Sequence, residues 1–241
     1  DDDREAWLAA REALLAPHRR PRFVSATTIA REAGVVPVDE ERDPDDPAGP
    51  GGLTGDADLP VAPRRRGRAG TAIGRAVHAT LQFTDLADPV GLDAQAARQA
   101  DLEAVPEHAG MIAAMARSAL ASGAVQLAAK GVSHKEIYVA APVGDRVIEG
   151  YIDLLVETPD GLVIVDYKTD TVASEADVDA KLATYELQGA AYAVALEEST
   201  GMPVVDCRFV FCRPSGAIER QVADLEAAKA RVRRHLAAPI R

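Results

Sequence analysis

The sequence has only two cysteines, Cys207 and Cys212, among its 241 residues. Two cysteines are too few for a disulfide framework or for a four-cysteine cluster that could hold zinc or iron and sulfur. Their odd-numbered separation would place them on opposite faces of a strand, so we expect two reduced, buried thiols. No iron–sulfur cluster is therefore expected.

Long apolar runs are also missing. No segment approaches the roughly 18 consecutive apolar residues that a membrane-spanning helix needs. The N-terminal segment DDDREAWLAA has neither the basic start nor the apolar stretch of a signal peptide. We therefore predict a soluble, cytoplasmic protein without a membrane partner. The chain lacks an initiating Met and opens with a helix-like pattern, which predicts that it is a fragment of a longer protein.

An excess of basic residues is absent as well, since the formal net charge is −11. Proteins that hold nucleic acid mainly through charge usually carry a basic excess. The charge is compatible with an enzyme that binds a metal through acidic side chains, or with a domain whose neighbours supply the grip. The densest basic cluster consists of Arg64, Arg65, Arg66 and Arg68. It is either the solvated end of a linker or a phosphate-contacting group.

The distribution of apolar residues divides the chain into three parts. Residues 1–34 are predicted to form two helical pieces, the second capped by Ser25, that connect to a part missing from this chain. Residues 35–69 are rich in Pro, Asp, Gly and Arg, which predicts a flexible or disordered linker. The 47% hydrophobic content suffices for one main domain, which we place at residues 70–241.

The main domain is predicted to begin with helices and to continue with strands. Helical spacing is found in the segments 71–83, 93–104, 107–121 and 122–130. Val, Ile, Leu and Tyr then dominate the segments 132–140, 145–157 and 162–169, with a hairpin turn at Pro159-Asp160-Gly161. A helix at 176–199, a strand at 204–212 and a helix at 225–236 complete the chain. This order predicts an α/β domain whose mixed central sheet contains three antiparallel strands and is flanked by helices.

Three charged residues stand out in the second and third of these strands, which read IEGYIDLLVETPDGLVIVDYKTD. Asp166 and Lys168 are two apart and share one face of their strand, and the hairpin brings Asp153 close to Asp166. Two converging carboxylates repel each other, and a hard cation such as Mg²⁺ relieves that repulsion. An Asp-x-Lys pattern alone is most often an ordinary exposed pair. A charged pair inside so apolar a strand is costly unless it is paired or coordinated, which favours a metal site.

This arrangement resembles the active-site signature of the PD-(D/E)xK nuclease superfamily, in particular its RecB-like branch and the C-terminal domain of AddA/RecB-type helicase–nuclease subunits. The resemblance rests on GYIDLL followed by IVDYKTD. It is extended by His78 in GTAIGRAVHATLQ, by Gln188 and Tyr192 in LQGAAY, and by the lead-in FVSATTIA. These motifs occur in the family's order. The resemblance implies a restriction-endonuclease-like core and a metal-dependent deoxyribonuclease similar to exonuclease V.

The resemblance also implies a role for each residue. Asp153, Asp166, His78 and the main-chain carbonyl of Tyr167 would hold Mg²⁺, for which Mn²⁺ is a substitute, and Lys168 would orient the nucleophile. Gln188 and Tyr192 would either brace the site or touch the substrate. From the residues alone, His78 fits a structural histidine better than a ligand. The strand carboxylates Glu136 and Glu149 are expected to be solvated and stay outside the catalytic set.

The sequence lacks a phosphate-cradling P-loop and a Ser-His-Asp nucleophile elbow, so this chain cannot itself be an ATP-driven motor. The expected partners are DNA ends, the helicase domains of the full-length chain and a second helicase–nuclease subunit. Two functions remain open: an exonuclease that processes double-strand ends for recombinational repair, and a catalytically silent nuclease fold that binds DNA or a partner subunit.

Overall fold

The structure is a computed structural model that describes residues 2–15, 23–32, 72–144 and 146–237. The predicted linker at 35–69, with its arginine cluster, lies outside these residues. Within the described ranges no single helix is long and apolar enough to cross a membrane, although the bent pair Pro106–Leu120 and Gly123–Lys130 would be so by length and composition alone.

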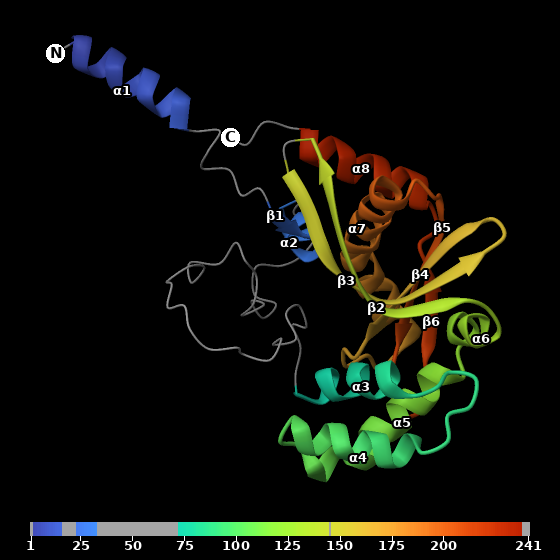
Figure 1. The fold of residues 1–241 in the computed structure, drawn as a ribbon. Coiled ribbons are helices and arrows are strands. Elements are labelled where there is room, and N and C mark those ends of the chain that lie inside the picture. The colour runs from blue at the N-terminus through green and yellow to red at the C-terminus, as the bar shows by residue number, and fades with distance from the viewer. Residues whose placement is uncertain (1, 16–22, 33–71, 145, 238–241) are drawn as a thin grey trace, which may run out of the picture.

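In residues 72–130, directly before the long strands, lie four α-helices and a short 3-10 helix, at the positions that the helical spacing predicts. They are α3 (Ala72–Phe83), α4 (Leu92–Leu102), η2 (Pro106–His108), α5 (Ala109–Leu120) and α6 (Gly123–Lys130). Ala and other small residues let them pack closely, and they bury a common core that includes Val77, Leu81 and Ile112. In Figure 1, α3, α4 and α5, drawn in teal and green, lie together below the sheet, and α6 lies beside β6.

The central sheet has six strands: β1 (Phe23–Ser25), β2 (Ser133–Val143), β3 (Arg146–Thr158), β4 (Gly161–Lys168), β5 (Val204–Phe211) and β6 (Ile218–Gln221). The predicted antiparallel set β2-β3-β4 is confirmed, and β5 pairs parallel with β4, so the sheet is mixed. The α/β fold class is thus confirmed, with more strands than the three antiparallel ones expected. β1 and β6 escaped sequence analysis because three or four residues are too short to show alternation.

Three helices lie on the other side of the sheet: α2 (Ala26–Glu32), α7 (Glu175–Thr200) and α8 (Leu225–Ala237). The Ser174 side chain caps α7, and the helix ends at Gly201, whose φ of 70° is a conformation that favours glycine. β1 and α2, inside the region predicted as a connector, pack in the same core as α7. The first helix, α1 (Asp2–Leu15), precedes them.

The two cysteines confirm the expectation for their strand. Both are buried and free. Cys207 belongs to the core on the α7 side, and Cys212 to the core beneath α3 to α6.

One edge of β3 pairs first with β1 and then with β4, and the gap between these two pairings, called the split below, positions the site. On one side β3 pairs with β2 from Arg146 to Val156. On the other side residues 147–149 pair with β1, and residues 154–158 pair with β4. The segment 150–153 therefore lies between the two partners. The alternation of faces also breaks here, because Ile152 and Leu155 both face the α7 side while Leu154 faces α3 to α6.

Candidate active site

Asp153 lies at this split and meets the helix that carries His78. The Nδ1 atom of His78 lies 3.0 Å from Oδ1 of Asp153, and both side chains are largely buried, with 17% and 11% of their surface exposed. The other carboxylate oxygen of Asp153 accepts a hydrogen bond of 2.7 Å from the backbone N–H of Tyr167. Asp153 thus joins helix α3 to strand β4.

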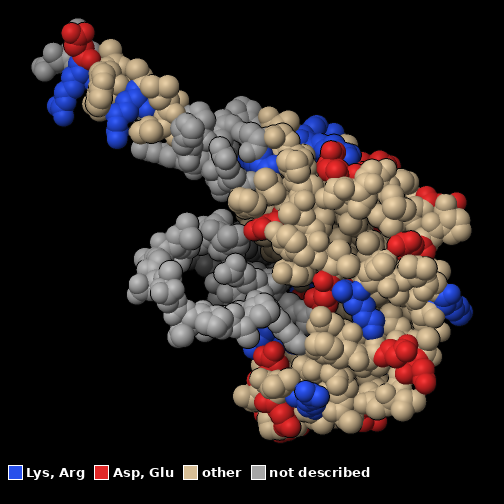
Figure 2. All heavy atoms as spheres, in the orientation of Figure 1, with Lys and Arg blue, Asp and Glu red and all other residues tan. Residues whose placement is uncertain are grey.

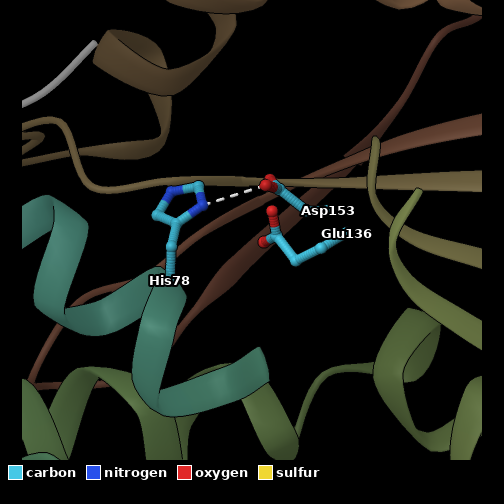
Figure 3. Close-up of side chains that lie close together, drawn as sticks. All are labelled: His78, Glu136 and Asp153. Carbon is cyan, nitrogen blue, oxygen red and sulfur yellow. Dashed lines mark hydrogen bonds and ion pairs between the residues drawn. The ribbon is translucent and has the colours of Figure 1, made fainter. Parts of the chain in front are cut away.

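Glu136 faces Asp153 from the neighbouring strand. One ligand atom of each of His78, Glu136 and Asp153 lies within 4.8 Å of the others (Figure 3). The backbone of Glu136 has a φ of 54°, which is costly for a residue other than glycine. Strain of this kind persists where surrounding structure enforces it, often at functional sites. Two carboxylates and one imidazole form a donor set that suits a divalent cation.

Asp166 and Lys168 form a buried pair on the side of α7. The ammonium of Lys168 lies 2.8 Å from Oδ1 of Asp166, with side-chain exposures of 12% and 9%. Burial raises the pKa of Asp166, the positive charge of Lys168 lowers it, and Asp153 raises it further, so the overall direction is upward. The carboxylates of Asp153 and Asp166 are thus close enough to repel each other, as the hairpin register indicates.

Lys168 is held by more than its carboxylate partner. It donates a hydrogen bond of 2.8 Å to Oε1 of Gln188 on α7 and lies 4.1 Å above the ring of Tyr185. The amide nitrogen of Gln188 in turn donates to the hydroxyl of Thr27 on α2, at 3.2 Å. Gln188 therefore links the lysine to two helices.

Tyr192 packs against β3 three residues before Asp153. It is 8% exposed, and a Cβ atom added to Gly150 would lie 2.6 Å from its Cε1 atom. No side chain larger than hydrogen fits at Gly150 without a shift of the Tyr192 ring. Gln188 thus contacts Lys168 and Tyr192 contacts Gly150, while the choice between bracing the site and touching the substrate stays a prediction for both.

The predicted residues therefore gather around one split in the sheet, but they form two groups. The group of potential ligands contains Glu136 and excludes Asp166, which forms its ion pair with Lys168. Sequence reasoning set Glu136 aside because most glutamates on strands are solvated. Its signal was the antiparallel register, which places position 136 opposite Asp153 between the pairs Lys135–Leu154 and Ile137–Ile152. Tyr167 contributes its backbone N–H to Asp153, and its ring packs edge-on against His78 at 5.9 Å.

The α/β sheet and its ligand group beside a lysine are typical of enzymes that bind a divalent cation. A family model described as the PD-(D/E)XK nuclease superfamily matches residues 55–241. The chain belongs to this superfamily, as its motifs predicted.

Curated relatives agree with this assignment. A protein described as the A subunit of an ATP-dependent helicase/nuclease, from Desulforudis audaxviator (strain MP104C), is 35% identical over 130 residues, which are 44% of this chain and 10% of that protein. A protein of the same description from Alkaliphilus oremlandii (strain OhILAs) is 44% identical over 57 residues, or 24% of this chain and 5% of that protein. The chain thus matches only a small part of these relatives' length. A solved structure described as "Crystal structure of SSO0001" aligns with a TM-score of 0.34 and 13% identity over 68% of this chain and 71% of that chain.

Proposed function

We propose that this chain is a divalent-metal-dependent DNA exonuclease domain, with Mg²⁺ as the ion and Mn²⁺ as a substitute. The observation that carries the proposal is the convergence of His78, Glu136 and Asp153 beside the buried Asp166–Lys168 pair, in a member of a nuclease superfamily. The donor set fits such an ion, because carboxylates are its preferred ligands and two of them converge here with an imidazole. When bound, the ion would polarise the scissile phosphate and acidify a water molecule.

The chain's own residues prepare the remaining chemistry. Asp166 and Gln188 hold the ammonium of Lys168 at a fixed place, where it can orient the attacking water and offset charge that develops on the phosphate oxygens. Asp153 and the Tyr167 ring fix the imidazole of His78. The proposed ligands are His78, Glu136 and Asp153, which converge in the structure, together with Asp166 and the Tyr167 carbonyl, which the family resemblance implies.

The names of the curated relatives support a wider setting for this domain. We place it in a cytoplasmic helicase–nuclease that processes double-strand DNA ends for recombinational repair. Its partners would then be DNA, helicase domains of the full-length chain and a second helicase–nuclease subunit. No membrane and no iron–sulfur cluster belong to this proposal.

The test is cleavage of end-labelled linear and circular DNA, single- and double-stranded, in Mg²⁺, in Mn²⁺ and in EDTA. We expect linear DNA to be degraded only with a divalent ion and circular DNA to resist, as an exonuclease requires. Asp166→Asn and Lys168→Met should abolish degradation because water and phosphate lose their orientation. Asp160→Asn, at the exposed hairpin turn, is the matched control and should retain full activity.

The alternative is a silent nuclease fold that binds DNA or a partner subunit. Wild-type chain that binds Mn²⁺ in calorimetry but degrades no DNA under any of these conditions would favour it. Degradation that persists in Asp166→Asn would remove Asp166 from the catalytic set.

A further inference from the structure

The half of the sheet next to the ligand group has one face that no described helix covers. On β2, Tyr138, Ala140 and Pro142 are exposed and alternate with buried residues. On β3, Glu149 and Tyr151 are partly exposed in the same alternation. Their buried neighbours Val139, Ala141, Ile148 and Ile152 all pack on the α7 side. The core beneath α3 to α6 takes residues of β3 only from Leu154 onward.

Two tyrosines stand side by side on this open face. Tyr138 and Tyr151 are cross-strand partners, and their ring centroids lie 5.2 Å apart. Tyr138 is 51% exposed, which is unusual for so large a ring on a sheet. Its hydroxyl donates a hydrogen bond of 2.6 Å to Glu149, so the ring is held in one orientation.

The tyrosine pair continues the ligand group along the same two strands. Tyr138 is two residues from Glu136, and Tyr151 is two residues from Asp153. Positions two apart along a strand are separated by about 7 Å. The alternation of faces breaks at Glu136 and Asp153, so the side on which these two carboxylates lie follows from their nearness to His78 and not from the spacing. His78 contacts Asp153 on this same face, because α3 belongs to the core opposite α7. A strand whose phosphate reaches the ligand group would thus carry its next bases over the tyrosines.

Because the chain is acidic, its affinity for DNA benefits from contacts that do not depend on charge. With a net charge of −11, the chain gains little affinity for DNA from charge overall. On the face that Figure 2 shows, Lys and Arg side chains stand in separate small groups. Stacking of bases on aromatic rings supplies affinity that does not depend on charge. The carboxylate of Glu149 disfavours a phosphate beside the pair but tolerates an uncharged base.

We propose that Tyr138 and Tyr151 form a stacking platform for the bases of a single DNA strand that runs into the ligand group. The proposal rests on the nuclease function proposed above and names its substrate class: unpaired bases. In a duplex the bases already stack on each other, so the platform discriminates in favour of a single strand.

The test measures binding without cleavage. A labelled oligothymidine of about ten nucleotides and a duplex of the same length are titrated with the 241-residue chain in EDTA, by fluorescence anisotropy. Tyr138→Leu and Tyr151→Leu should each weaken single-strand binding by about tenfold and duplex binding by less. Tyr138→Phe keeps the ring and should bind like wild type. Because stacking is uncharged, the dependence of log K on log salt should keep its slope in the leucine variants.

Leu102→Ala is the control, since Leu102 is an apolar side chain on α4 that is 67% exposed, more than Tyr138. Leucine variants that bind the oligothymidine like wild type would overturn the platform, as would a Phe variant as weak as the Leu variant. The two proposals fail separately. Tyrosine-dependent binding without cleavage in Mg²⁺ counts against the nuclease alone, whereas cleavage with unchanged KM and kcat in both leucine variants counts against the platform alone.

Discussion

The contact between Gly150 and Tyr192 gives a sharp test of how β3 is held at the split. In Gly150→Ala, the new Cβ atom would lie 2.6 Å from Cε1 of Tyr192, closer than real Cβ contacts, and 3.2 Å from its hydroxyl, which is tighter than most. The ring is 8% exposed and cannot swing into solvent freely. Overpacking of this kind costs about 1–3 kcal/mol. For a chain of this size, each kcal/mol lowers Tm by about 2–4 °C, so we expect Tm to fall by about 2–12 °C.

The assay is thermal unfolding followed by circular dichroism. Gly110→Ala is the matched control, because a Cβ atom at this exposed position on α5 meets nothing within 4 Å. Its Tm should stay level or rise slightly. In a double-mutant cycle, Tyr192→Leu should relieve part of the strain, so the two losses should sum to more than the loss of the double variant. A Gly150→Ala chain that melts with wild type would refute the claim that Tyr192 braces β3.

Three further outcomes follow from other contacts. Glu136→Gln should weaken Mn²⁺ binding in calorimetry by at least about tenfold, and unchanged affinity would remove Glu136 from the ligands. Lys135 donates hydrogen bonds to the carbonyls of Leu81, Gln82 and Thr84 at the end of α3. Lys135→Met should weaken Mn²⁺ binding by about tenfold, because the helix that carries His78 is then held less firmly. Lys135→Arg should restore part of the lost affinity. Burial raises the pKa of Glu197, but hydrogen bonds from Lys229, Val204 and Arg233 lower it more, so the pKa in the folded protein is below its usual value of 4.5. The ionised Glu197 therefore stabilises the fold fully above the unfolded pKa, and this stabilisation is lost as the pH falls through the lower folded pKa. Glu197→Gln should therefore reduce the free energy of unfolding at neutral pH, by urea denaturation, and the difference from wild type should shrink in acid.

Sequence patterns could predict the long elements and the motif residues. The hairpin of β3 and β4 was readable because two apolar runs flank Pro159-Asp160-Gly161, and its register follows from that turn. Asp166 and Lys168 were predictable because burying charged side chains in an apolar strand is costly unless they are paired or coordinate a metal. His78 was predicted as a metal ligand from the family resemblance and not from periodicity, because a histidine on an apolar helix face is more often structural.

The remaining features depend on contacts between segments far apart in the chain. β1 is visible only through its pairing with residues 147–149, which lie more than a hundred positions later. Glu136 is a candidate ligand because its carboxylate lies near His78 and Asp153, and its backbone has a positive φ that nothing in the sequence SHKEIYV signals. Lys135 looks like a solvated strand lysine, yet its ammonium is placed against the end of α3. Local propensity carries no information on such long-range contacts.

The exchange of partners along β3 explains how one site can use residues from both sides of a sheet. In a continuous sheet Asp153 and Lys168, which contact α3 and α7 respectively, would be separated by a layer of backbone. Between the end of the β1 ladder and the start of the β4 ladder, that layer is interrupted at residues 150–153. Asp153 can therefore bond to His78 on one side and raise the pKa of Asp166 on the other. The same interruption lies beside Tyr151, on the face of the sheet that no described helix covers.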